Sequence, residues 1–482
     1  MTSTSAPKEA VPASNTDSAA TLDRPARTPR RSPTDLSFVL DEADVTARAA
    51  NEPDWLAADR RDALERYRSL PIESNQLYTP YVDLRPAELG DVRVYPLPGG
   101  PPLGAASAAD LPAGAVALAR FDEDKVSAIS LDATARDAGV TVETLGSLIG
   151  RDAQLARRLI GGAGLPGDDR LAQLTRAAWN QGVVIRVPKG VRLDRPILVR
   201  WAAGAADRAI FSRTIVELGE RAAASIVEEF VPSSASDEGP DSGQALFTST
   251  FEAHLGAEAE LAVASIQDFG PRQVLFQHRT AAIGEGASLH WALAQLGSRL
   301  VRSRVDNRLE GDRSSVEQVE IVFGTGEQLF DLTSYTLHLG RDTTGNLLSK
   351  GALLDRARSY MKGLITIEKS AVGTDSFLGE FGMNLSKATR AVAIPSLEID
   401  QPDCRRAAHS SSVGPIDANQ LFYLESRGIA PDEARKFIVL GFLEPVVARV
   451  PLEAAQERLR ELLEEKWAAG ADGTAGSAGA AA

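Results

Sequence analysis

Short hydrophobic runs, alternating with polar residues and interrupted by glycine or proline, occupy the chain from residue 182 to residue 415. The segment 182–201, GVVIRVPKGVRLDRPILVRW, is rich in β-branched residues and predicts short strands. A glycine-containing turn recurs between such runs, at Gly219, Gly256, Gly284, Gly311 and Gly340. The last three separations are 28, 27 and 29 residues, while the first, of 37, contains the polar insertion 231–243.

A single period near 28 residues in strand-like sequence predicts a stacked repeat. One unit holds two or three short strands and cannot bury its apolar side alone, whereas stacked units form a continuous core. We therefore predict a mainly β protein whose core, residues 182–415, is a parallel β-helix. The alternative is a β-sandwich or an antiparallel meander, in which turns are also regularly spaced. The single long period favours the β-helix.

Helical periodicity replaces this pattern on the N-terminal side. Leu56, Ala63, Leu64 and Tyr67 recur at helical spacing and Pro71 ends the segment. A second helical zone is predicted from residue 141 to residue 181, so that 41–181 forms a mainly helical domain. Residues 1–40 and 468–482 are rich in small residues, and we expect both to be disordered tails.

Residues 416–467 return to helix. Asp417 suits a helix N-cap, while Pro431 and Pro451 each suit the first turn of a following helix. A solenoid needs a cap at its end, but three helices are more than a cap requires. We therefore predict a C-terminal helical domain with a surface for a partner.

Composition narrows the functional classes. The 482 residues carry a net charge of −14, which disfavours nucleic acid as a partner. No segment is long and apolar enough for a membrane span, so we expect no membrane partner. The single cysteine, Cys404, excludes an intrachain disulfide and a four-cysteine iron–sulfur site held by this chain alone. With no apolar signal core near the N-terminus, it indicates the cytoplasm.

Catalytic motifs are missing from the sequence: there is no phosphate-binding GxxxxGK[ST], no GxSxG, no HExxH and no CxxC. Carboxylates are frequent in the β region, among them Glu228, Glu320 and Glu380. A pair of them on one face would suit a β-solenoid enzyme that acts on carbohydrate or acyl substrates. Few aromatic residues for sugar stacking count against this enzyme, and we expect no catalytic activity.

His409 is the most distinctive candidate ligand. It lies among small residues in DCRRAAHSSSVG, at the end of the β region, five residues after Cys404. In an extended strand, an odd separation places two side chains on opposite faces. A site shared by Cys404 and His409 therefore requires a bend between them.

Three segments carry a resemblance to a known family. Residues 391–442, AVAIPSLEIDQPDCRRAAHSSSVGPIDANQLFYLESRGIAPDEARKFIVLGF, resemble the signature of the SufB/SufD iron–sulfur cluster assembly scaffolds. Residues 182–199 and 347–371 resemble other parts of the family core, and the resemblance covers about residues 45–467. It implies a right-handed parallel β-helix between helical regions, and a scaffold rather than an enzyme.

The resemblance also implies partners. SufB and SufD pair through their β-helices, and each binds the ATPase SufC through its C-terminal helices. Among the residues of this chain, Arg435, Phe437, Phe442 and Glu444 are the expected SufC contacts.

Within the family the single cysteine favours SufD over SufB, although a SufB-type, cluster-carrying scaffold is the alternative. The cysteine of the SufD pattern falls on Ala407, while His409 is preserved. His409 is then the expected ligand of a transient Fe–S cluster shared with SufB, with Cys404 as a second candidate. No cluster is expected to be held stably by this chain alone.

Overall fold

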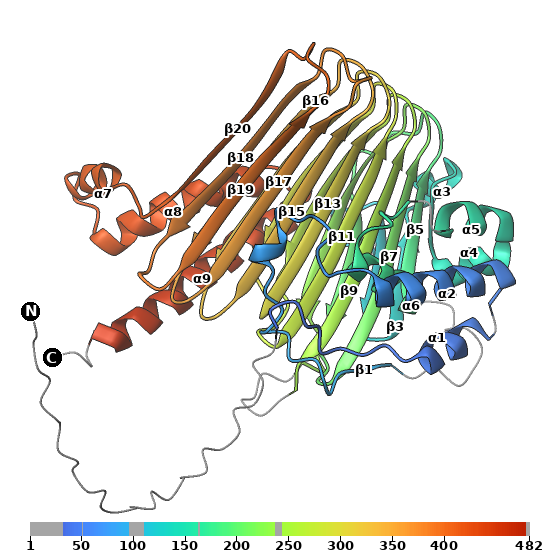
Figure 1. Ribbon diagram of the computed structural model, residues 1–482, viewed down its shortest axis with the longest axis horizontal. Coiled ribbons are helices and arrows are strands. Elements are labelled where there is room, and N and C mark those ends of the chain that lie inside the picture. The colour runs from blue at the N-terminus through green and yellow to red at the C-terminus, as the bar shows by residue number, and fades with distance from the viewer. Residues whose placement is uncertain (1–31, 51, 96–109, 162–163, 237–242, 479–482) are drawn as a thin grey trace, which may run out of the picture. The chain divides into compact units, whose positions relative to one another are not determined.

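A computed structural model describes residues 32–50, 52–95, 110–161, 164–236 and 243–478. Residues 1–31 and 479–482 of the predicted tails lie outside the described residues, as does part of the polar insertion 231–243. Two large sheets dominate the structure (Figure 1).

Sheet A contains, in spatial order, β19 (Arg390–Ile399), β17 (Arg358–Ile367), β15 (Leu329–His338), β13 (Leu300–Leu309), β11 (Gln273–Ile283), β9 (Ala245–Leu255), β7 (Arg208–Leu218), β5 (Gln181–Val187) and β4 (Thr141–Thr144), with β1 (Arg93–Val94) beside β7. Sheet B contains β20 (Arg406–Gly414), β18 (Asp375–Asn384), β16 (Thr344–Leu353), β14 (Ser315–Gly324), β12 (Ser288–Gln295), β10 (Glu260–Gln267), β8 (Ala223–Pro232), β6 (Ile197–Ala203), β2 (Ala117–Asp122) and β3 (Lys125–Leu131).

From β5 onward the chain alternates between the two sheets, and each pair of consecutive strands forms one coil. Eight coils follow one another, from β5 and β6 to β19 and β20, and neighbouring strands within each sheet are parallel. The predicted β-solenoid is therefore confirmed. Each coil contains two strands, because the turn with the glycine bends the chain only from sheet A to sheet B.

The turn glycines stack as the sequence period predicts. A Cβ on Gly256 would lie 2.8 Å from Glu220 N, in the corresponding turn of the preceding coil. A Cβ on Gly311 would lie 2.0 Å from Glu285 N, and one on Gly340 would lie 2.3 Å from Gly311 O. The coils approach so closely at this corner that only a hydrogen atom fits there.

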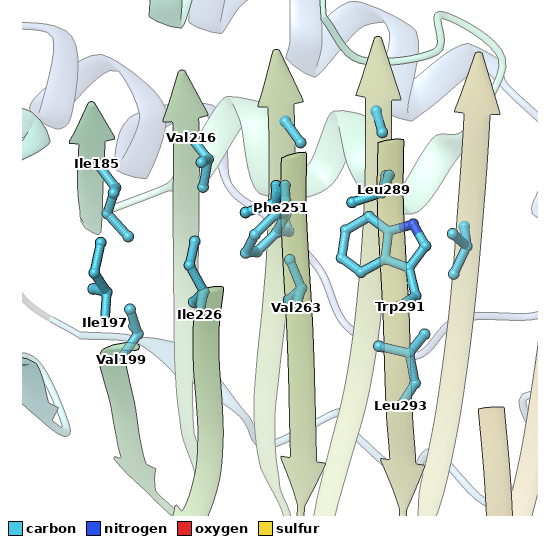
Figure 2. Packing of buried hydrophobic residues seen from close by; sticks show 14 of the residues in the cluster. Ile185, Ile197, Val199, Val216, Ile226, Phe251, Val263, Leu289, Trp291 and Leu293 are labelled. Carbon is cyan, nitrogen blue, oxygen red and sulfur yellow. The ribbon is translucent and has the colours of Figure 1, made fainter. Parts of the chain in front are cut away.

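Side chains that point between the sheets form the core of the solenoid. Figure 2 shows Ile197, Ile226, Val263 and Trp291 beside one another on successive strands of sheet B. Trp291 packs edge-on against Phe251 of sheet A, with ring centroids 5.4 Å apart. Each coil thus contributes one residue to every column of the core, and the columns continue from coil to coil.

The N-terminal region covers the outer face of sheet A. Its helices are α1 (Glu42–Ala49), α2 (Asp54–Ser69), the 3₁₀ helix η1 (Thr79–Tyr81), α3 (Ala133–Asp137), α4 (Leu145–Arg151), α5 (Ala153–Ile160) and α6 (Arg170–Ala178). The apolar side chains of Leu64 and Leu174 pack with Phe211 and Phe276 of the sheet.

This region differs from the separate helical domain that the sequence predicts. Strands β1 to β4 lie within it and pair with both sheets, because their alternating residues extend the solenoid core. The predicted N-terminal tail also ends early. Phe38 and Leu40 are buried, so the chain is packed before residue 41.

The C-terminal helices are α7 (Ala418–Glu425), α8 (Pro431–Val447) and α9 (Glu453–Ala478). Val439 of α8 and Leu459 of α9 pack against the outer face of sheet B. Helix α9 continues beyond residue 467, where the sequence predicts a tail, since the alanine-rich segment that follows contains no proline. Among the described residues, no helix has the length and apolar character needed to cross a membrane.

Candidate functional site

The last coil leaves both sheets open. Strands β19 and β20 each pair with one neighbour, and within the described residues no strand pairs with their outer edges. Figure 1 shows them together at the end of the stack that is remote from β3 and β4. Ile399 and Val413 expose apolar side chains here, at 45 % and 39 %. An unpaired strand edge with apolar side chains is a surface on which another strand can pair.

His409 faces the interior side of this coil. Its register partner on β18 is Leu378, whose own partner on β16 is Leu347. The column continues through the core residues that Figure 2 shows, namely Ile197, Ile226, Val263 and Trp291, by way of Gln318. Residues in one column point the same way, so the imidazole occupies the end of the core column, where no further coil covers it. Its side chain is accordingly exposed.

Ala407 and Cys404 lie on the same side of the coil. Both are half-buried against the hydrophobic cluster that contains Leu378. The sequence argument that Cys404 and His409 point to opposite faces fails, because Cys404 lies in the turn before β20 and the strand alternation does not reach it. Within the described residues, no three His, Cys, Asp or Glu side chains are grouped as a metal site.

Glu380 is a buried carboxyl beside the last coil, and the sequence does not distinguish it from the other carboxylates. Its side chain is 1 % exposed, and burial raises its pKa to about 8. Its register partner on β20 is Ser411, two residues after His409. Gly363 on sheet A makes room for it, since a Cβ there would lie 2.9 Å from Glu380 Oε1.

A second exposed feature is the helical pair α7 and α8. Phe422, Tyr423 and Phe437 are 71 %, 55 % and 58 % exposed, and no residue of α7 is buried. Figure 1 shows α7 away from the strands, at the N-terminal end of α8. Together with Ile399 and Val413, these side chains are five of the seven large exposed apolar residues in the described chain. The exposed apolar surface is thus concentrated in the last coil and these two helices.

The four predicted partner residues differ in their surroundings. Arg435 and Phe437 are exposed on α8. Phe442 instead faces sheet B, with Lys350 Nζ 4.7 Å from its ring centroid. Glu444 is half-buried and pairs with Arg460 of α9 at 3.2 Å. Arg435 and Phe437 are therefore available to a partner, while Phe442 and Glu444 hold α8 in place.

Comparison with known proteins identifies the region that contains both features. The family model described as SUF system FeS cluster assembly, SufBD core domain, matches residues 201–442. The chain belongs to the SufB/SufD family. The matched region begins in β6 and ends in α8, so it includes the last coil of the solenoid and the exposed aromatic residues of α7 and α8.

Relatives within the family place the chain nearer to SufD. The iron–sulfur cluster assembly protein SufD of Bacillus subtilis is 27 % identical over 340 residues, which are 70 % of this chain and 76 % of the relative. A SufBD family protein of Mycobacterium tuberculosis is 26 % identical over 345 residues, 70 % of this chain and 84 % of the relative. A SufBD family protein of Staphylococcus epidermidis is 24 % identical over 338 residues, 70 % and 71 % of the two chains. The resemblance to SufD is therefore confirmed.

The inward position of His409 was available in the sequence. Leu347, Leu378 and His409 are each 31 residues apart, so the apolar residues one and two coils earlier indicate an inward column. The same spacing relates Ser349, Glu380 and Ser411. The signal was missed because the turn glycines gave a period near 28, and the late coils are longer.

Proposed function

We propose that this chain is the SufD-type scaffold subunit of a SUF assembly, in which it pairs with a SufB-like protein and binds the ATPase SufC. The observation that carries the proposal is the position of His409, at the open end of the solenoid core beside two unpaired strand edges. A partner that covers these edges would also enclose the imidazole. A ligand in this place serves a cluster formed between two subunits.

His409 suits the role of a ligand in its neutral form. Its neighbours Ala408 and Ser410 are small, so an iron atom can approach the ring. The cluster is the cargo of the assembly, and this chain alone supplies one such ligand at the open end. Cys404 is half-buried against apolar side chains, which disfavours the thiolate that iron requires. In the proposal His409 therefore acts without Cys404, in the reducing cytoplasm.

The SufC surface is proposed at α7 and the exposed side of α8. Three exposed aromatic side chains and the cation of Arg435 lie there, and aromatic and arginine side chains are frequent at protein interfaces. The buried side of α8 packs on sheet B and gives this surface a firm support.

Co-expression with the SufB-like and SufC-like proteins of the same organism tests the proposal. Size exclusion with mass determination is expected to give one complex that contains all three chains. His409→Ala is expected to leave the mass of the complex unchanged and to lower the iron and sulfide bound after reconstitution. His290→Ala is the matched control, because His290 is an exposed histidine, 49 % accessible, on the outer face of sheet B.

Two results would contradict the proposal. Assembly of the other two proteins without this chain would remove the scaffold role. A complex that forms normally and binds the same amount of cluster with His409→Ala would remove the ligand role and leave the pairing intact.

A further inference from the structure

A cavity of about 800 Å³ opens at the second corner of the solenoid, where strands of sheet B end and strands of sheet A begin. Three parts of the chain line it: the N-terminal segment at Pro86, the corner turns at 268–271, 296–299 and 325–328, and Lys466 of α9. Small-molecule sites commonly form where such separate elements meet, and their volumes are about 300–1,000 Å³.

The cavity is positively charged in a chain of net charge −14. Its lining contains four basic residues, Arg299, Arg356, Arg358 and Lys466, against two acidic ones, Asp268 and Glu327. Glu327 forms an exposed ion pair with Arg356 at 2.7 Å, and both side chains are 70 % accessible. An exposed pair of this kind contributes little to stability and can exchange for another anion.

Two of the arginines are held by the N-terminal segment. Arg299 Nε donates to the carbonyl of Pro86 at 3.0 Å, and its guanidinium lies 3.7 Å from Glu88. Arg358 pairs with Asp83 at 3.1 Å. These contacts fix the positions of the guanidinium groups and leave part of their donors directed to the cavity, since each guanidinium has five N–H donors.

Lys466 is the least compensated cation. Its ammonium donates to two neutral oxygens, the carbonyl of Leu296 and Gln328 Oε1, the latter at 2.9 Å. Burial lowers the pKa of Lys466 to about 8, although the charge of Asp268 acts in the opposite direction. An anion in the cavity would stabilise the charged ammonium, which the protein itself stabilises only in part.

We propose that this cavity binds a phosphoryl anion with several charges, either inorganic pyrophosphate or the diphosphate of a nucleotide. Arginine donors match phosphate oxygens in geometry, and a lysine adds a point charge beside them. The ligand would bridge α9 and the corner turns, so binding would strengthen the attachment of α9 to the solenoid. The site is remote from His409 in the coil order and does not depend on the scaffold role.

Calorimetric titration of the full chain with pyrophosphate, at pH 8 and low salt, tests the site. We expect saturable binding that weakens with salt, and about ten-fold weaker binding in Arg356→Gln. Arg313→Gln is the matched control, because Arg313 forms an equivalent exposed pair with Glu285, also at 2.7 Å, in a turn at the glycine corner. Absence of binding, or equal weakening in both variants, would overturn the proposal.

Proton uptake gives a second readout that a general surface attraction would not produce. Titrations at pH 8 in two buffers with different ionisation enthalpies are expected to show that binding takes up protons, because the anion raises the pKa of Lys466. Lys466→Met is expected to abolish this uptake. Proton uptake that persists in Lys466→Met would contradict the assigned position. Tighter binding of ADP than of pyrophosphate would identify a nucleotide, and the reverse order an inorganic ligand.

Discussion

Glu380 Oε2 accepts a hydrogen bond of 2.8 Å from the backbone N–H of Ile394. Glu380 belongs to sheet B and Ile394 to the last strand of sheet A, so this bond joins the two sheets across the interior at the end of the solenoid. A buried carboxyl thereby holds β19 near β20, next to the column that ends in His409.

The protonation of Glu380 is expected to affect stability. Burial raises its pKa to about 8, so its contribution is fully present below the unfolded value of 4.5 and is lost as the pH rises through 8. Glu380→Gln keeps an oxygen acceptor for Ile394 without a charge. We expect this variant to match the wild type at pH 4.5 and to be about 3 kcal/mol more stable at pH 8.5.

Urea unfolding at several pH values measures the difference between Glu380→Gln and the wild type. Glu285→Gln, at an exposed position, should show no such pH dependence. If the difference between Glu380→Gln and the wild type is the same at pH 4.5 and pH 8.5, the carboxyl is not neutral in the folded protein.

His278 is expected to show the opposite sign on substitution. It lies on the outer face of sheet A, with Nδ1 2.9 Å from Asp169 at the N-cap of α6 and Nε2 3.1 Å from Asp306. Burial alone lowers the pKa of His278, but hydrogen bonds and charge interactions with the two aspartates outweigh it and raise the pKa to about 9. Arg304 also pairs with both aspartates.

The stability that His278 contributes is fully present below pH 6.5 and is lost as the pH rises through 9. His278→Gln is therefore expected to cost about 3 kcal/mol at pH 6 and much less at pH 9.5. Hydrogen exchange of α6 and unfolding curves at both pH values provide the measurement. A penalty that does not change with pH would show that the imidazole is neutral at pH 6.

Two glycine substitutions should have opposite effects. Gly311→Ala places a Cβ 2.0 Å from a backbone nitrogen of the preceding coil and is expected to lower the unfolding free energy by about 2–3 kcal/mol. Gly441 lies in α8, and a Cβ there meets no atom within 4 Å. Gly441→Ala should therefore raise the unfolding free energy by about 0.5–1 kcal/mol. Thermal unfolding compares the two, and equal changes would refute the close stacking at the glycine corner.

The aromatic residues of α8 should separate partner binding from stability. Phe437→Ser is expected to leave the melting temperature nearly unchanged and to weaken SufC binding about 30-fold, because an exposed aromatic side chain would be an interface anchor. Phe442→Ser should instead lower the melting temperature, since its ring lies against Lys350. Leu77→Ser, equally exposed at 58 % in the N-terminal region, is the control. Unchanged SufC affinity in Phe437→Ser would place the contact elsewhere.

The sequence by itself determined the repeat and its corner. Gly219, Gly256, Gly284, Gly311 and Gly340 indicated stacked coils, because a close backbone approach excludes every side chain larger than hydrogen and so leaves a visible period. The helix starts at Asp417 and Pro431 were predictable for a similar local reason, since caps act within one turn.

Only the tertiary structure decided which polar residues are buried and which helical face is exposed. Glu380 resembles any other carboxylate in the sequence, and its burial depends on Gly363 and Ile394, which belong to the opposite sheet. Phe437 and Phe442 lie on one helix with similar local sequence, yet sheet B covers one and leaves the other exposed. Local propensities and repeats are recorded along the chain, whereas burial results from contacts between segments far apart in it.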